Sequence, residues 1–166
     1  MYLEDIFDYK NELAKTLCCN EEIVRLVTGS KEAPVPNYSL MYSQLFPYQF
    51  IPETVDDAQT FICFDVDIVS VDNKTLYTPA LYVFAFTHKD LLRLDEGGVR
   101  TDKLACEIDK ELNGSRFFGL GELDLFSVER FVPIADYQGR ILTYYAKDFN
   151  RSRPSMKPPV NRKQRG

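Results

Sequence analysis

The chain has 166 residues, 45% of them hydrophobic, and a formal net charge of −5. This length favours one domain with its own core, and this hydrophobic content is typical of a globular fold rather than a disordered or fibrous chain. No apolar run reaches the ~18 residues of a membrane-spanning helix, and the acidic, amphipathic N-terminus does not resemble a signal peptide. We therefore expect no membrane association. Four cysteines without C-x-x-C spacing, Cys18, Cys19, Cys63 and Cys106, are expected to be reduced core residues of a cytosolic chain.

Two helices are predicted at the N-terminus. Residues 2–17 place apolar side chains at helical spacing, with acidic and basic residues on the remaining face. Asn20 is a favourable N-cap for a second, shorter helix, and Gly29 is placed to end it. The two form a helical hairpin or one bent helix.

Residues 30–58 interrupt the regular pattern. Four prolines exclude a regular helix, yet the segment is too apolar to be a disordered linker. It either lies across the body or reaches a neighbouring subunit, and the sequence leaves both possibilities open. Its aromatic residues are candidate interface anchors, because aromatic side chains carry much of the binding energy of interfaces. These candidates are Tyr38, Tyr42, Phe46, Tyr48 and Phe50.

A β-hairpin follows this segment. The stretch from Thr60 to Val71 alternates between two faces, as a strand does, and the stretch from Pro79 to Thr87 is rich in aromatic and branched residues. The residues 72–74 between them are a turn. After the hairpin, Leu104, Ile108 and other apolar residues recur at helical spacing up to Asn113-Gly114, which ends the helix.

A second hairpin completes the body. Strands are predicted from Leu123 to Val132 and from Arg140 to Ala146, with a turn over residues 136–139. The order of elements therefore predicts an α+β fold, in which an antiparallel four-stranded sheet, two hairpins joined by a helix, carries helices packed on one face. We expect residues 1–149 to form this single domain.

The remaining residues, 150–166, are predicted to be a basic, disordered C-terminal tail. Residues 1–148 carry 14 basic and 25 acidic residues, a net −11, whereas residues 149–166 carry six basic residues and no acid, a net +6. Such a tail suits an anionic partner, or else it is a solvated extension that keeps the body soluble. The candidate partner-binding residues are Arg151, Arg153, Lys157, Arg162, Lys163 and Arg165.

Few residues are candidates for catalysis or metal binding. The single histidine, His88, stands at a strand end, where a polar residue closing the strand is the simplest interpretation. Asp65 and Asp67 share one face of a strand and could hold a divalent metal in a small nuclease, although nothing in the sequence places a third ligand. A solvated sheet face is the alternative for this pair. We expect no catalytic residues, no metal and no cofactor.

The pattern of elements over residues 55–149 resembles the small neck proteins of tailed bacteriophages, especially tail terminators and their tail-completion relatives. The resemblance is carried by Phe84-Ala-Phe-Thr-His88-Lys-Asp90, by residues 98–109, by Gly119-Leu-Gly121 with the strand after it, and by Tyr137-Gln-Gly139-Arg140 with the closing strand. The segment 34–52 and the basic tail depart from that pattern.

The resemblance implies a structural virion protein of the phage neck. Such a protein forms a ring, commonly a hexamer, that caps the tail tube and joins tail to head. Its partners would be other copies of itself, a head-completion or connector protein, and a tail tube or sheath protein, while DNA passes through the lumen without sequence-specific binding. It would be assembled in the host bacterial cytoplasm and end in the virion. The alternatives are the small metal-dependent nuclease and a DNA-binding accessory protein that acts through the basic tail.

Overall fold

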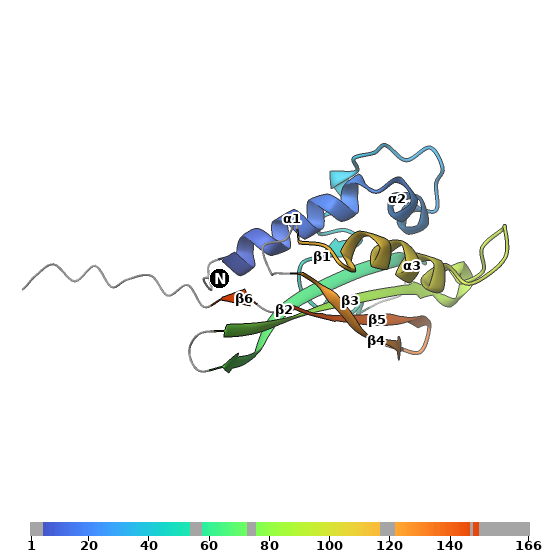
Figure 1. Ribbon diagram of the computed structural model, residues 1–166. Helices are drawn as coiled ribbons and strands as arrows, with labels where there is room; N and C mark the ends of the chain where they lie inside the picture. Colours follow the sequence, from blue (N-terminus) through green and yellow to red (C-terminus); the bar gives the residue numbers. More distant parts are fainter. Residues whose placement is uncertain (1–4, 54–57, 73–75, 117–121, 147, 150–166) are drawn as a thin grey trace, which may run out of the picture.

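Three helices cover one face of a twisted sheet (Figure 1). The computed structural model describes residues 5–53, 58–72, 76–116, 122–146 and 148–149. The helices are α1 (Asp5–Cys19), α2 (Glu21–Thr28) and α3 (Arg100–Leu112), with two short 3-10 helices, η1 (Tyr38–Leu40) and η2 (Lys89–Leu91). The predicted α+β class, with helices on one face, is confirmed.

In the described residues the sheet has six strands. The four long strands are antiparallel: β2 (Thr60–Asp72), β3 (Leu76–His88), β4 (Asp124–Phe131) and β5 (Tyr137–Tyr145). The short strand β1 (Leu45–Phe46) runs parallel to β2, and β6 (Asp148–Phe149) pairs with the start of β3. The order is β1-β2-β3-β5-β4. The prediction of a four-stranded antiparallel sheet is therefore corrected to a six-stranded mixed one, because two-residue strands leave no period in a sequence.

The helix ends follow the predicted capping residues. The side-chain oxygen of Asn20 accepts a hydrogen bond from the Ile23 amide at 2.9 Å, as an N-cap does. Gly29 and Gly114 stand just beyond α2 and α3 with φ angles of 72° and 76°, where glycine pays no steric penalty. The first helix ends at Cys19, two residues later than expected.

The main core lies between the helices and the covered face of the sheet. Leu104 and Ile108 of α3 are fully buried there, as predicted, together with residues of α1, α2 and strands β2, β3 and β5. This one cluster runs from Tyr9 to Ala146. Of the four cysteines expected in the core, only Cys18 and Cys63 are buried, whereas Cys19 and Cys106 are exposed. Burial raises the pKa of each buried thiol to about 11.

The described part of the segment 30–58 lies on its own subunit. Leu40 and Leu45 join the main core. The Gln44 side-chain amide donates to the carbonyl oxygens of Val27 at 3.0 Å and Thr60 at 3.1 Å, which ties the segment between α2 and β2. Of the two paths left open by the sequence, these residues take the one across the body.

The second hairpin turns earlier than predicted. Tyr137 and Gly139 belong to β5, and the turn occupies residues 132–136. Gly139 serves a close approach between strands: a Cβ atom there would meet the Ala85 carbonyl oxygen and lie 2.6 Å from Phe86 Cα. The predicted basic tail, residues 150–166, lies outside the described residues.

Candidate assembly surfaces

The face of the sheet opposite the helices is organised in rows across the four long strands. The register aligns Phe61, Phe86, Gly139 and Phe131 in one row, which is followed along the sheet by the rows of Cys63, Asp65 and Asp67. The row of Asp67 ends on β4 at Asp124. This open face therefore has an aromatic end and an acidic end.

The aromatic end is closed within the subunit. Phe46, Phe61, Cys63, Phe86 and Tyr137 form a second buried cluster. The ring of Phe50 stacks on Phe46 with centroids 4.1 Å apart and an interplanar angle of 15°. The segment after β1 therefore covers this end of the face.

This packing separates the five predicted interface anchors into buried and exposed residues. Phe46 is buried and Phe50 is half-buried against it, so both serve the fold of their own subunit. Tyr38, Tyr42 and Tyr48 are exposed by 53%, 63% and 45% and stay candidates for an interface. All three lie in the segment around β1, at one edge of the sheet.

At the acidic end, the described side chains of Asp67, Asp124 and Glu129 are exposed. Half-buried tyrosines lie among them: burial raises the pKa of the Tyr82 hydroxyl, and its neighbours Tyr145 and Asp67 raise it further. Phe126, 67% exposed, packs its ring 4.8 Å from that of Tyr145. This end combines negative charge with aromatic surface.

The two aspartates considered for a metal site differ in their surroundings. Asp65 Oδ1 lies 2.5 Å from Lys10 Nζ of α1 and accepts a hydrogen bond from the Val66 amide at 2.8 Å. Lys10 also donates to the Pro47 carbonyl oxygen at 3.0 Å, so Asp65 belongs to a link between α1, β2 and the segment after β1. Asp67 is exposed. Within the described residues, no group of three or more His, Cys, Asp or Glu side chains is placed to hold a metal ion.

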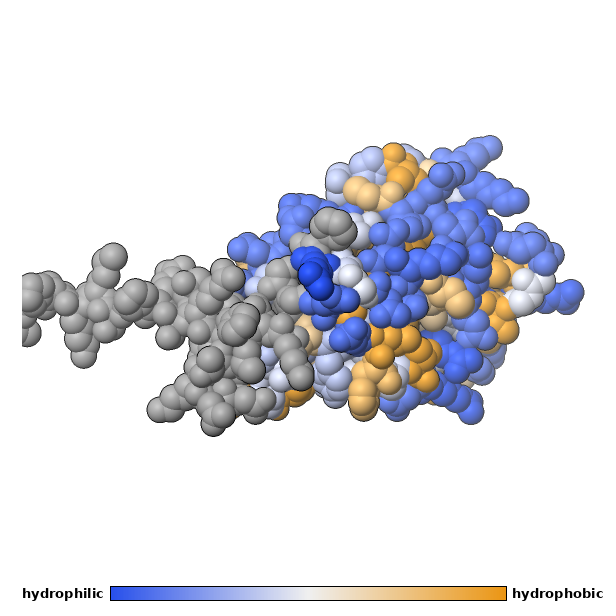
Figure 2. Space-filling model, viewed as in Figure 1, coloured by the Kyte–Doolittle hydropathy of each residue, from blue (hydrophilic) through white to orange (hydrophobic). Residues whose placement is uncertain are grey.

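An apolar groove runs beside the edge strand β4. It has a volume of about 270 Å³ and lies between α3 and β4, with Ala105, Cys106, Leu125, Val128 and Leu142 among its lining. Val128 is 48% exposed. Figure 2 shows a hydrophobic patch over β4 and the neighbouring part of β5. Because β4 ends the strand order, its outer edge has no strand partner among the described residues.

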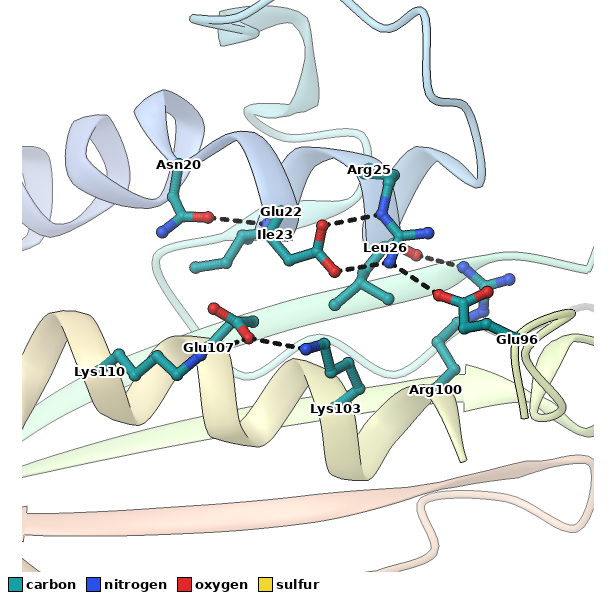
Figure 3. A network of polar contacts seen from close by, with 10 residues as sticks. All are labelled: Asn20, Glu22, Ile23, Arg25, Leu26, Glu96, Arg100, Lys103, Glu107 and Lys110. Atoms are coloured by element: carbon teal, nitrogen blue, oxygen red, sulfur yellow. Dashed lines mark hydrogen bonds and ion pairs between the residues drawn. The ribbon is translucent and has the colours of Figure 1, made fainter. Parts of the chain in front are cut away.

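A polar network joins α2 to α3 on the helix layer, and the sequence did not indicate it (Figure 3). Arg100 donates to the Leu26 carbonyl oxygen at 2.6 Å, at the end of α2, and burial lowers its pKa. Glu107 of α3 is buried, and its carboxylate is bonded to Lys110 at 2.8 Å and to Lys103 at 3.2 Å. The burial of this side of α3 depends on where α2 lies, and the sequence of α3 alone does not show that.

His88 closes β3, as interpreted from the sequence. It is buried, its ring meets that of Tyr137 edge-on at 5.3 Å, and its Nδ1 accepts a hydrogen bond from the Asp90 amide at 3.3 Å. These contacts are those of a residue that caps η2.

Residues 12–146, most of the chain, match the model of a phage-associated protein family. That family is YomW, and the chain belongs to it. No curated protein matches the sequence. In the described part of the chain, no helix is both long and apolar enough to cross a membrane.

Proposed function

We propose that this chain is a structural protein of the phage neck, a ring-forming tail terminator that caps the tail tube and joins tail to head. The family is phage-associated. The order of elements that resembles tail terminators is the order of the fold, a helix between two hairpins. The protein acts by assembly and has no turnover to perform.

The observation that carries the proposal is the pair of surfaces at opposite edges of the sheet. The β4 edge with its apolar groove ends the sheet on one side, and the segment around β1, with exposed Tyr38, Tyr42 and Tyr48, ends it on the other. A contact between two different surfaces of identical subunits builds a ring when the rotation closes. Tyrosine side chains suit such a groove, since they bring apolar area and a polar tip. The neighbour also covers the exposed strand edge.

The negative net charge of the body also supports a ring around passing DNA. The body, residues 1–148, carries a net −11. A ring of such subunits surrounds a lumen of negative potential, which does not trap a passing polyanion such as DNA. The proposed ring is a hexamer located in the virion, and its proposed partners are a head-completion or connector protein above it and the tail tube or sheath protein below.

Electron microscopy of particles made with and without the protein tests the proposal. Its loss should yield tails of irregular length or filled heads without tails. Normal infectious particles after deletion, or a defect confined to DNA replication or host lysis, would contradict the terminator role.

A pair of matched variants tests the edge contact itself. Val128→Lys places a charge at the groove, and Val69→Lys places one at a site of similar exposure, 46% against 48%, on β2. Both should change the free energy of unfolding by no more than ~0.5 kcal/mol, as surface substitutions do. Only Val128→Lys should disturb tail length. Equal effects of the two variants would show that β4 is not the assembling edge.

The nuclease alternative has its own test. Asp65→Ala combined with Asp67→Ala would abolish a metal-dependent nuclease activity measured on duplex and single-stranded DNA. Activity in the unmodified protein that this double variant loses would favour the enzyme over the assembly subunit.

A further inference from the structure

The described strands of the sheet place acidic but no basic side chains on its open face. Strands β2 to β5 place Asp65, Asp67, Asp124 and Glu129 on it and contribute no lysine or arginine. The arginines of β4 and β5, Arg130 and Arg140, are paired across the two strands on the opposite, helix-covered side. Lys10 neutralises Asp65, whereas the structure gives the other three carboxylates no cationic partner among the described residues.

Aromatic rings and a hollow accompany these carboxylates. Tyr82, Phe126 and Tyr145 lie among them, and aromatic faces attract arginine guanidinium groups in particular. Where β5 ends, Thr78, Glu122, Asp124, Tyr145 and Ala146 line a hollow of about 550 Å³. We call this surface, Asp67, Tyr82, Asp124, Phe126, Glu129 and Tyr145, the acidic face.

We propose that the acidic face binds the basic C-terminal segment, residues 150–166, of a neighbouring copy of this chain. The inference rests on the proposed ring, which sets copies side by side. The segment carries six basic residues, four of them arginines, and no acid. It is therefore complementary to the acidic face in both charge and side-chain type.

The direction of the chain at β6 favours a neighbour as the receptor. In β6, Asp148 pairs with Tyr77 and Phe149 with Leu76, so the chain runs toward the start of β3 and away from the row of Asp67 and Ala80. At Phe149 the described chain therefore runs away from its own acidic face. The 17 residues of the segment span at most ~60 Å at ~3.3–3.6 Å per residue, enough to reach an adjacent subunit.

Binding of a labelled peptide of residues 149–166 to the purified full chain tests the inference by fluorescence anisotropy. We expect saturable binding that rising salt weakens, because exposed charges are screened. Asp67→Asn with Asp124→Asn should weaken it roughly tenfold, as the loss of two charge pairs on a shared surface implies. Asp8→Asn with Glu21→Gln removes the same charge from exposed positions on α1 and α2 and should leave binding unchanged.

One further variant of the full chain separates the remaining possibilities. A full chain with all six basic residues of the segment replaced by Gln should bind the peptide as the unmodified chain does. At a concentration at which the unmodified chain is monomeric, tenfold or greater improvement would place the segment on its own subunit and overturn the assignment to a neighbour. No binding, an equal response to both acidic double variants, or tight binding of the peptide to duplex DNA but not to the protein would overturn the inference as a whole.

This assay is independent of the terminator role. Peptide binding together with normal tails after gene deletion would contradict only the proposed function. Absent binding together with irregular tails after deletion would contradict only the docking of the C-terminal segment.

Discussion

The two faces of the sheet differ in how they are covered within the subunit. The face under the helices is apolar over most of its area, with Arg130 and Arg140 at its β4 side, and three helices close it within the subunit. Among the described residues, the open face is closed only at its aromatic end, by Phe50 and the residues around β1, and its other end is acidic. Burial of aromatic side chains stabilises a subunit, whereas exposed carboxylates contribute little to its stability and are available to a partner. The covered face and the aromatic end therefore hold the fold, and the acidic end is available for the binding proposed above.

The largest expected effect lies at the aromatic end. Phe86 is fully buried, with the rings of Phe61, Phe131 and Tyr137 at 5.4, 5.6 and 5.9 Å. Phe86→Ala should lower the free energy of unfolding by about 3–5 kcal/mol through lost burial and the cavity left behind. Denaturant titration measures the loss. A change below ~1 kcal/mol would mean that the aromatic end does not stabilise the subunit.

The covered face should respond almost as strongly. Ile108→Ala removes a fully buried side chain from the side of α3 that faces the sheet and should cost ~2–5 kcal/mol. A thermal melt measures it. Melting indistinguishable from the unmodified protein would show that α3 does not face the core.

A third substitution tests the register between the hairpins. Gly139→Ala adds a Cβ atom against the backbone of Ala85 and Phe86, which cannot move aside without disturbing β3. We expect a loss of ~1–3 kcal/mol, the usual range for overpacking. The matched control is Gly114→Ala, where the added Cβ meets no atom within 4 Å and the cost arises only from the positive φ. Replacement at residue 139 without loss would contradict the register of β5 on β3.

Gly139 also shows where the sequence misleads. A glycine shortly after Asp136 predicts a turn over residues 136–139. Gly139 instead lies within β5, where a close approach to β3 requires it, and the turn comes earlier, at residues 132–136. The helices and the two hairpins could be predicted because their periods and caps are local. The strands β1 and β6 could not, since two residues carry no period.

Contacts between residues distant in the chain also decide which of the candidate interface residues are buried and which are exposed. Composition marks Phe46 and Tyr42 alike as aromatic residues in an irregular segment, but only the path of the chain decides that Phe46 enters the cluster on the open face and Tyr42 does not. The burial of Glu107 likewise depends on where α2 comes to lie. The charge split between body and tail, in contrast, could be seen in the sequence, because charge needs no fold to be counted.

The helix layer should show a smaller, pH-dependent effect at Glu107. The hydrogen bond from Lys110 lowers the pKa of this carboxyl most, with a further contribution from Lys103. A lowered pKa in the folded state means stabilisation that is present above the ordinary carboxyl pKa of about 4.3 and lost as the pH falls through the lowered value. Glu107→Gln should therefore cost about 1 kcal/mol at pH 7, and the difference from the unmodified protein should shrink below about pH 4. A difference independent of pH would assign the loss to packing.

The smallest effect on stability is expected at the acidic end, and there the contrast between the two ends is sharpest. Phe126 is 67% exposed, and among the described residues its ring contacts only that of Tyr145. Phe126→Ala should change the free energy of unfolding by about 0.5 kcal/mol or less, against several for Phe86→Ala in the same sheet face. If the acidic face binds arginines of a neighbour, the same substitution should weaken binding of the C-terminal peptide, because a cation–π partner is lost. Loss of stability comparable to that of Phe86→Ala would instead make this end a part of the fold, and its exposed ring would need no partner.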